Sequence, residues 1–163
     1  MEARTLHAPL DALSAANRPQ GIEIATLTTF DIPALAVLTL EAYDDAVTPE
    51  ALLETSEELR LTFEGAFGDT TEDSFVGAWD GGTLVGAILV VRESPWDDVP
   101  NGPFVVDLIV APDYRRRGIA TALVSEVASR CTHWGFDSLA LRLDARHGGD
   151  RELYSMLGFE EIA

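Results

Sequence analysis

Short runs of apolar or alternating apolar and polar residues recur along the chain. Such runs are typical of β-strands. They cover residues 21–28 (GIEIATLT), 74–79 (SFVGAW), 83–91 (TLVGAILVV), 104–110 (FVVDLIV) and 138–143 (SLALRL). Asp80, Gly81 and Gly82 separate the second run from the third. Because this is a strong signal for a tight turn, these two runs predict a β-hairpin.

Other segments repeat apolar residues every three or four positions, which is typical of amphipathic helices. These segments cover residues 31–42, 48–63, 119–131 and 150–157. Asp31 and Thr48 are the expected N-caps of the first two, and each is followed within two residues by a proline. Gly135 stands where the C-terminal cap of the third helix is expected.

The order of these elements, β, α, α, β, β, β, α, β, α, predicts a mixed α/β protein built around one sheet. A chain of 163 residues is a natural size for one domain. Residues 1–20 mix alanine, proline, asparagine and charged residues without a steady period. We therefore expect a loosely held N-terminal extension over residues 1–20 and a single domain over residues 21–163.

The charge of the chain excludes several classes of function. It has 28 acidic residues and 11 basic ones, for a net charge of −17, and every basic residue other than histidine is an arginine. Without lysine, neither a Schiff base nor a Walker-type phosphate loop can form. The negative field argues against nucleic acid as a partner and favours cationic small molecules or peptides. The alternative is that the acidity only keeps the protein soluble.

The cysteine, the histidines and the longest apolar runs limit the remaining classes of function and location. Cys131 is the only cysteine and falls on the apolar stripe of the third helix, so we expect it in the core rather than as a nucleophile. His7, His133 and His147 are too widely spaced for a zinc site. No run approaches the ~20 apolar residues of a membrane helix, and the N-terminus lacks the pattern of a secretory signal. These features predict a cytoplasmic protein.

A concentrated positive charge follows the strand 104–110, in the stretch PDYRRRGIATAL at residues 112–123. The first N–H groups of a helix have no internal partner and lie at the positive end of its dipole, so they attract anions. Gly118 and Ala120 leave room for a pyrophosphate close to the main chain. The stretch therefore predicts a site for a phosphorylated ligand, with a solvated basic loop as the alternative.

Two motifs together resemble the acyl-CoA-dependent N-acetyltransferases of the GNAT superfamily. They are Arg115-x-x-Gly118-x-Ala120 after FVVDLIVAPDY, and ELYSMLGF at residues 152–159. The resemblance covers roughly Gly21 to the end and implies a central mixed, mostly antiparallel sheet flanked by helices. It implies acetyl-CoA as co-substrate and no metal. The residues that it assigns to the CoA pyrophosphate are Arg115, Arg116, Arg117, Gly118, Ile119 and Ala120.

The resemblance also implies roles along the strand and in the last helix. Leu108, Ile109 and Val110 would offer main-chain groups to the pantetheine arm where this strand splays from its neighbour. Tyr154 would lie near the CoA sulfur as general acid, since a phenol with a pKa near 10 can protonate a departing thiolate. An N–H of Ile109 or Val110 would stabilise the oxyanion. The alternative for Tyr154 is a packed core tyrosine.

Acetylation of an amine also requires removal of a proton by a base or a water chain. The resemblance makes Asp107 the first candidate, because the family often places a carboxylate in this strand. Asp144 and the pair Glu72 and Asp73 are rivals, and many relatives manage without a dedicated base. Asp107 can equally be a strand-end carboxylate that accepts a backbone hydrogen bond.

The chain departs from the family pattern in two places. His147 stands where relatives often carry an asparagine, and only four residues follow Phe159, whereas the family usually ends with two more strands. Either that wall of the acceptor pocket is missing, or the residues before Gly21 or a partner subunit of a homodimer supply it. We expect an N-acetyltransferase that acts on a primary amine through a direct ternary complex. The alternatives are a non-catalytic acyl-CoA sensor or interaction module and an anion-binding domain for another nucleotide.

Overall fold

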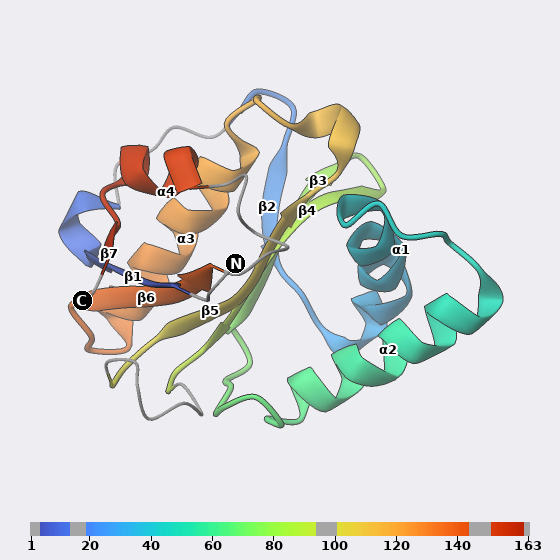
Figure 1. Ribbon diagram of the computed structural model, residues 1–163, viewed down its shortest axis with the longest axis horizontal. Coiled ribbons are helices and arrows are strands. Elements are labelled where there is room, and N and C mark those ends of the chain that lie inside the picture. Colours follow the sequence, from blue (N-terminus) through green and yellow to red (C-terminus); the bar gives the residue numbers. More distant parts are fainter. Residues whose placement is uncertain (1–3, 14–18, 94–100, 144–150, 162–163) are drawn as a thin grey trace.

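The computed structural model describes residues 4–13, 19–93, 101–143 and 151–161. Within this part of the chain, one sheet of seven strands runs in the order β2-β3-β4-β5-β6-β1-β7 (Figure 1). Its neighbouring strands are antiparallel, except that β5 and β6 are parallel. The sheet is therefore mixed and mostly antiparallel, which confirms the expected fold class. The strands are β1 (Arg4–Pro9), β2 (Glu23–Thr26), β3 (Phe75–Asp80), β4 (Thr83–Val91), β5 (Phe104–Val110), β6 (Ser138–Leu143) and β7 (Glu160–Glu161).

Helices cover both faces of the sheet, with α1 and α2 on one face and α3 and α4 on the other (Figure 1). Short 3-10 turns precede α1 and α3 and follow β1. The helices are α1 (Ile32–Ala42), α2 (Pro49–Phe63), α3 (Ile119–His133) and α4 (Arg151–Leu157), and the turns are η1 (Leu10–Ala12), η2 (Thr29–Asp31) and η3 (Pro112–Tyr114). The predicted order of elements from β2 to α4 is thus confirmed.

The alternation of side chains along β5 divides the apolar core into two clusters. Leu108 is buried in a cluster with Leu123 of α3, whereas Ile109 is buried in a second cluster with Leu35 of α1. We call these the α3-side cluster and the α1-side cluster. Because side chains in a strand alternate between the two faces, Asp107 shares the α1 face with Ile109.

The helix caps agree with the sequence fully at Thr48 and in position only at Asp31. The Thr48 hydroxyl accepts a hydrogen bond from the N–H of Ala51 at 3.1 Å, as an N-cap should. Asp31 stands at the N-cap position of α1, as expected, but its side chain makes no cap bond to that helix. It closes a capping box one turn earlier, where its carboxylate accepts the Thr28 N–H at 2.8 Å and the Thr28 hydroxyl accepts the Phe30 N–H at 3.3 Å.

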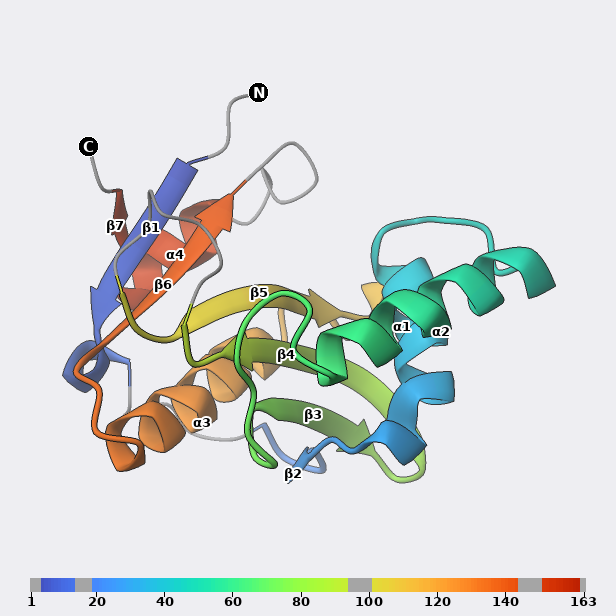
Figure 2. The same cartoon turned by 90° about the horizontal axis from the view of Figure 1, so that it is seen from below.

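The N-terminus contains an integral strand of the sheet, so the expected loosely held extension over residues 1–20 is wrong for its first half. Strand β1 pairs antiparallel with β6 over its whole length, from Arg4 opposite Leu143 to Pro9 opposite Ser138. Strand β7 pairs with the other edge of β1. Figure 2 shows β1 beside β6 at this end of the sheet.

Burial explains why this segment is ordered. Four apolar side chains of β1, η1 and the residue after it are buried in the α3-side cluster: Leu6, Ala8, Leu10 and Leu13. Leu6, Ala8 and Leu10 follow the period of two that is typical of a strand. Of the alternatives open for the wall beyond β6, the structure shows that residues before Gly21 in the same chain supply a strand there.

Candidate functional site

Strands β5 and β6 begin side by side and then part. Their parallel pairing consists of Phe104 with Ala140 and Val105 with Leu141. Beyond these pairs β6 continues to Leu143 and β5 to Val110, and the two strands diverge in Figure 2. We call the place where the two strands part the opening. Leu108–Val110, where the family resemblance implies a splay, lie in the part of β5 that follows its last pair with β6.

A β-bulge marks the point where the strands part. On β4, Leu89 is opposite Asp107 and Val90 is opposite Val105, so Val106 is an extra residue in β5. A bulge bends its strand and increases the local twist. The bend therefore falls directly after the last pair with β6 and directly before Asp107.

Main-chain groups of β5 face the opening at alternate residues. The N–H of Ala111 donates to the carbonyl of Val85 on β4 at 2.8 Å. Because antiparallel partners exchange hydrogen bonds at every second residue, Ile109 also faces β4, whereas Leu108 and Val110 face away from it. Of the three residues predicted to offer main-chain groups, Leu108 and Val110 are therefore oriented toward the opening and Ile109 is not.

The loop between η3 and α3 presents the start of a helix at the end of β5. Arg116 and Gly118 both have left-handed backbones, with φ of 63° and 83°. The first hydrogen bond of α3 runs from the Ala122 N–H to the Gly118 carbonyl at 3.0 Å. The N–H groups of residues 119–121 precede it, and a helix offers such groups no internal partner. The start of α3 therefore lies where the sequence predicts a helix start, and the binding of an anion there stays a prediction.

The three predicted phosphate-binding arginines are exposed, but their side chains make different contacts. The guanidinium of Arg115 donates to the carbonyl of Ala42 at 2.6 Å and to the carbonyl of Val110 at 3.2 Å. The guanidinium of Arg117 lies 4.8 Å from the centre of the Tyr114 ring. Arg115 thus ties the loop to the end of α1, a role that sequence reasoning missed.

Tyr114 fastens the same loop to the β3–β4 hairpin. Its hydroxyl donates to the carboxylate of Asp80 at 2.6 Å. This hydrogen bond is the largest cause of a raised pKa for the Tyr114 phenol. The phenol is therefore protonated at neutral pH and serves as the donor. No local signal identified this contact, because the two residues are 34 positions apart.

Asp107 lies immediately after the bulge and is half-buried. Its Oδ1 accepts a hydrogen bond from the hydroxyl of Tyr43, the C-cap residue of α1. The two residues are 64 positions apart, so no local pattern in the sequence pairs them. The contact places the Asp107 side chain on the α1 face of the sheet, beside the opening.

Tyr154, the predicted general acid, lies on the other face. Its side chain is 2% exposed and belongs to the α3-side cluster, together with Leu108 and Leu141. Its ring packs edge-on against Phe159, with the centroids 5.8 Å apart. The two predicted catalytic residues thus belong to opposite faces of the sheet, and between these faces β5 parts from β6.

The Acetyltransferase (GNAT) family model matches residues 38–159, which is most of the chain. The chain belongs to this family. No curated protein matches it in sequence.

Solved structures share the GNAT fold with this chain. A GCN5-related N-acetyltransferase from Sphaerobacter thermophilus has a TM-score of 0.68 at 23% identity, over 98% of this chain and 48% of its own. PH1933 from Pyrococcus horikoshii OT3 has a TM-score of 0.73 at 16% identity, over 87% of this chain and 90% of its own. The PaiA N-acetyltransferase from Thermoplasma acidophilum, in complex with coenzyme A, has a TM-score of 0.64 at 20% identity, over 85% of this chain and 89% of its own. The chain therefore spans about half the length of the Sphaerobacter protein.

The rival base Asp73 does not lie at the opening of this GNAT fold. It precedes β3, at the end of the sheet where the Val90 N–H donates to the Ser74 carbonyl, far along β4 from the start of α3. Burial acts to raise the pKa of Asp73, but hydrogen bonds from Thr71 and Trp134 outweigh it and lower that pKa below its ordinary value. Its neighbour Glu72 is exposed. Asp144 and His147 lie outside the described residues.

Cys131 is fully buried in the core of the α3 side, as expected. Burial raises the pKa of its thiol to about 12. The thiol is therefore protonated at neutral pH, which excludes a thiolate nucleophile here. Within the described ranges, no group of three or more potential metal-ligating side chains occurs, and no helix is long and apolar enough to cross a membrane.

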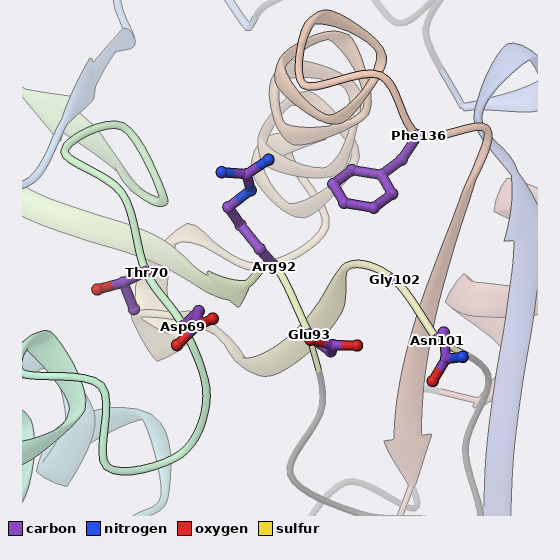
Figure 3. Close-up of a pocket in the computed structure, with 7 residues that line it drawn as sticks. All are labelled: Asp69, Thr70, Arg92, Glu93, Asn101, Gly102 and Phe136. Carbon is purple, nitrogen blue, oxygen red and sulfur yellow. The ribbon is translucent and has the colours of Figure 1, made fainter.

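A hollow of about 530 Å³ lies at the start of β5, whereas the loop between η3 and α3 follows the end of that strand (Figure 3). Arg92, just after β4, extends beside Phe136, and its guanidinium lies 5.7 Å from the centre of that ring. The hollow is thus separate from the opening between β5 and β6. Its lining residues are Asp69, Thr70, Arg92, Glu93, Asn101, Gly102 and Phe136.

Proposed function

We propose that the protein is an N-acetyltransferase that moves an acetyl group from acetyl-CoA to a primary amine in a direct ternary complex. The proposal rests mainly on one observation: β5 separates from β6 next to two groups that the reaction needs. The first turn of α3 lies at one end of the opening, and the Asp107 carboxylate lies beside it. Membership of the GNAT family supports acyl transfer as the chemistry.

Under this proposal the pyrophosphate of CoA binds to the main chain at residues 115–120. The N–H groups at the start of α3 supply donors already in place, and the guanidinium groups of Arg116 and Arg117 add positive charge. The pantetheine arm then follows β5, where Leu108 and Val110 face the opening. The PaiA relative, which was solved with coenzyme A, supports a CoA-binding role for this fold.

The acyl transfer follows from ordinary acid–base chemistry. An alkyl amine with a pKa near 10.4 is mostly protonated at pH 7, which costs roughly 4 to 5 kcal/mol to reverse. In our proposal Asp107 accepts this proton, directly or through water. The amine nitrogen then attacks the thioester carbon, and the N–H of Val110 stabilises the oxyanion. The C–S bond breaks as the C–N bond is completed, and Tyr154 protonates the departing thiolate. The nitrogen then loses its second proton, which returns the Tyr154 phenolate to the phenol, directly or through water.

The acceptor that we propose is a cationic amine, either a small molecule or a peptide. The net charge of −17 supports this choice, and the exposed Asp44 and Asp45 follow Tyr43 beside the Asp107 face. The single buried cysteine agrees with a cytoplasmic location. Because β1 supplies a strand beyond β6 from the same chain, the proposal does not require the partner subunit of a homodimer.

Ligand-induced stabilisation tests the proposal at its first step. Acetyl-CoA at about 100 times its dissociation constant should stabilise the fold by roughly 2.7 kcal/mol, and a thermal shift measures this. Thiol release from acetyl-CoA with a panel of primary amines then tests for transfer. Binding without release for any amine would favour the alternative, a non-catalytic acyl-CoA sensor or interaction module. The absence of a thermal shift would overturn both.

A further inference from the structure

The end of α1 is fastened to β5 at two points. The hydroxyl of Tyr43 donates to the carboxylate of Asp107. One residue earlier, the carbonyl of Ala42 accepts a hydrogen bond from Arg115 at 2.6 Å, and the same guanidinium donates to Val110 at 3.2 Å. Since Asp107 and Val110 both belong to β5, these contacts close a ring between the two elements.

Helix α1 lacks the cation that normally stabilises a helix C-terminus. Its last turn contains no basic residue, although the last carbonyls of a helix carry partial negative charge and have no partner within it. The guanidinium of Arg115 supplies that charge from another part of the chain. A guanidinium suits this position because its fixed fork of donors can reach two carbonyl oxygens at once, which an ammonium does less well.

The contacts of Arg115 lead away from the expected phosphate site. Its Nε and Nη2 atoms donate to main-chain carbonyls of β5 and α1. No hydrogen bond of Arg115 to α3, which begins at Ile119, occurs among those described. Arg116 and Arg117 carry the same charge in the same loop. The side chain of Arg115 is thus committed to the α1 side of the opening.

We propose that Arg115 is a positioning residue for the acceptor side of the site: it holds the end of α1 so that Tyr43 orients the carboxylate of Asp107. This inference rests on the proposed function. A base must be held within hydrogen-bond reach of the amine, and small misplacements in such sites are costly. The arrangement also links the loop that would bind CoA to the carboxylate that would meet the amine.

The turn after Tyr43 shows what the contact holds in place. Asp44 has a left-handed backbone with φ of 58°, and its N–H donates to Glu41 at 3.2 Å. The N–H of Asp45 donates to Leu40 at 2.8 Å. A non-glycine residue in this conformation needs support from its surroundings. We expect Arg115 to contribute part of that support through Ala42.

Hydrogen exchange tests whether Arg115 holds the end of α1, and it does not require enzyme activity. Arg115→Gln and Arg116→Gln each remove one positive charge from the same loop, so they form a matched pair. Losing a charge-assisted hydrogen bond should speed exchange of the amides of residues 43–45 by about tenfold in Arg115→Gln. Arg116→Gln should leave these amides at the wild-type rate. Equal exchange in the two variants would overturn the proposal.

Binding and kinetics test the proposed role in positioning. We expect Arg115→Gln to bind acetyl-CoA as the wild type does, within about twofold, and to show amine kcat/KM lower by about fivefold or more. Tyr43→Phe should show the same pattern, and the double variant Tyr43→Phe/Arg115→Gln should lose little more than either single variant. Arg116→Gln should instead raise the dissociation constant for acetyl-CoA about two- to fivefold.

The proposed role in positioning would be overturned if Arg115→Gln raised the dissociation constant for acetyl-CoA as Arg116→Gln does, because Arg115 would then be a phosphate ligand. If Arg115→Gln unfolds, Tyr43→Phe and Arg115→Lys provide the same comparison. Lysine keeps the charge but not the fork, so Arg115→Lys should resemble Arg115→Gln. Failure of the proposed function is distinguishable, since wild-type protein would then show no acetyl-CoA thermal shift whatever the exchange rates are.

Discussion

Gly86 of β4 lies directly beneath Ile119, the first residue of α3. A Cβ atom at Gly86 would lie 2.8 Å from Cγ2 of Ile119 and 3.2 Å from Cδ1 of Leu123. Both side chains are at most 1% exposed. The absence of a side chain at Gly86 therefore lets α3 rest on the sheet at the helix end that would bind CoA.

Gly86→Ala should weaken CoA binding by moving this helix end. The added methyl group overpacks a buried contact, at a cost of about 1 to 3 kcal/mol in the free energy of unfolding. The start of α3 must shift relative to β5, so we expect a higher dissociation constant for acetyl-CoA. Denaturant unfolding and calorimetric titration measure the two effects. Gly82→Ala is the control, since a Cβ there has nothing within 4 Å; a similar loss in that variant would contradict the argument.

Gly118→Ala should impair CoA binding through the backbone. Its φ of 83° costs an alanine roughly 1 to 2 kcal/mol, although the nearest atom to the new Cβ is 3.8 Å away. Relief of this strain rotates the first N–H groups of α3, so we expect the dissociation constant for acetyl-CoA to rise about tenfold. Gly81→Ala in the β3–β4 turn imposes strain at φ of 59° with nothing within 4 Å. It should lower stability similarly and leave affinity unchanged; equal affinities in the two variants would argue against a phosphate site at Gly118.

Local patterns were sufficient to predict most elements and the loop at the start of α3. Helix and strand periods are properties of neighbouring residues, and a glycine at position 118 is compatible with a left-handed backbone because it has no Cβ atom. The splay of β5 came from the family resemblance rather than from the pattern. The strand β1 was missed because it is short, with an arginine at its start and a proline at its end, and because its partner, β6, is more than 100 positions away.

The contacts that organise the site could not be predicted from the sequence. Tyr43 reaches Asp107 and Arg115 reaches Ala42 across 64 and 73 positions. Such pairs depend on how the helices pack on the sheet, which no local period encodes. The same reason explains why the contact between Arg115 and Ala42 was not expected. Identical residues in one loop can face different parts of a site.

Leu10→Ala should show how much the N-terminal segment of β1 and η1 contributes to stability. Leu10 is 2% exposed in the α3-side cluster, and its N–H donates to the Asp137 carbonyl at 2.9 Å. Truncation of a buried leucine costs about 2 to 5 kcal/mol, which denaturant unfolding measures. The adjacent Asp11 is exposed, so Asp11→Ala should change stability by about 0.5 kcal/mol or less. If the two variants were equally stable, burial of Leu10 would contribute little to the stability of the fold.

Asp73 should make folding stability sensitive to acid. Its pKa lies below its ordinary value of 3.8 in the folded protein, because hydrogen bonds from Thr71 and Trp134 outweigh burial. A lowered folded-state pKa contributes stability that is present above the unfolded pKa and is lost as the pH falls through the folded one. Urea unfolding from pH 6 down to about pH 3 should thus show a shallower loss for Asp73→Asn than for wild type. Glu72→Gln, at the exposed neighbour, should keep the wild-type slope; a wild-type slope in Asp73→Asn would exclude this role.

Tyr154→Phe separates the proposed general acid from a core tyrosine. The variant keeps the ring that packs edge-on against Phe159 and removes only the hydroxyl. If that hydroxyl protonates the thiolate, kcat should fall by about 10²-fold or more, while the dissociation constant for acetyl-CoA changes little. Tyr114→Phe is the matched control, because it removes the hydroxyl bonded to Asp80 without touching the proposed chemistry. Thiol release measures kcat and titration measures affinity. An unchanged kcat in Tyr154→Phe would remove Tyr154 as the acid and leave it as a packing residue of the α3-side cluster.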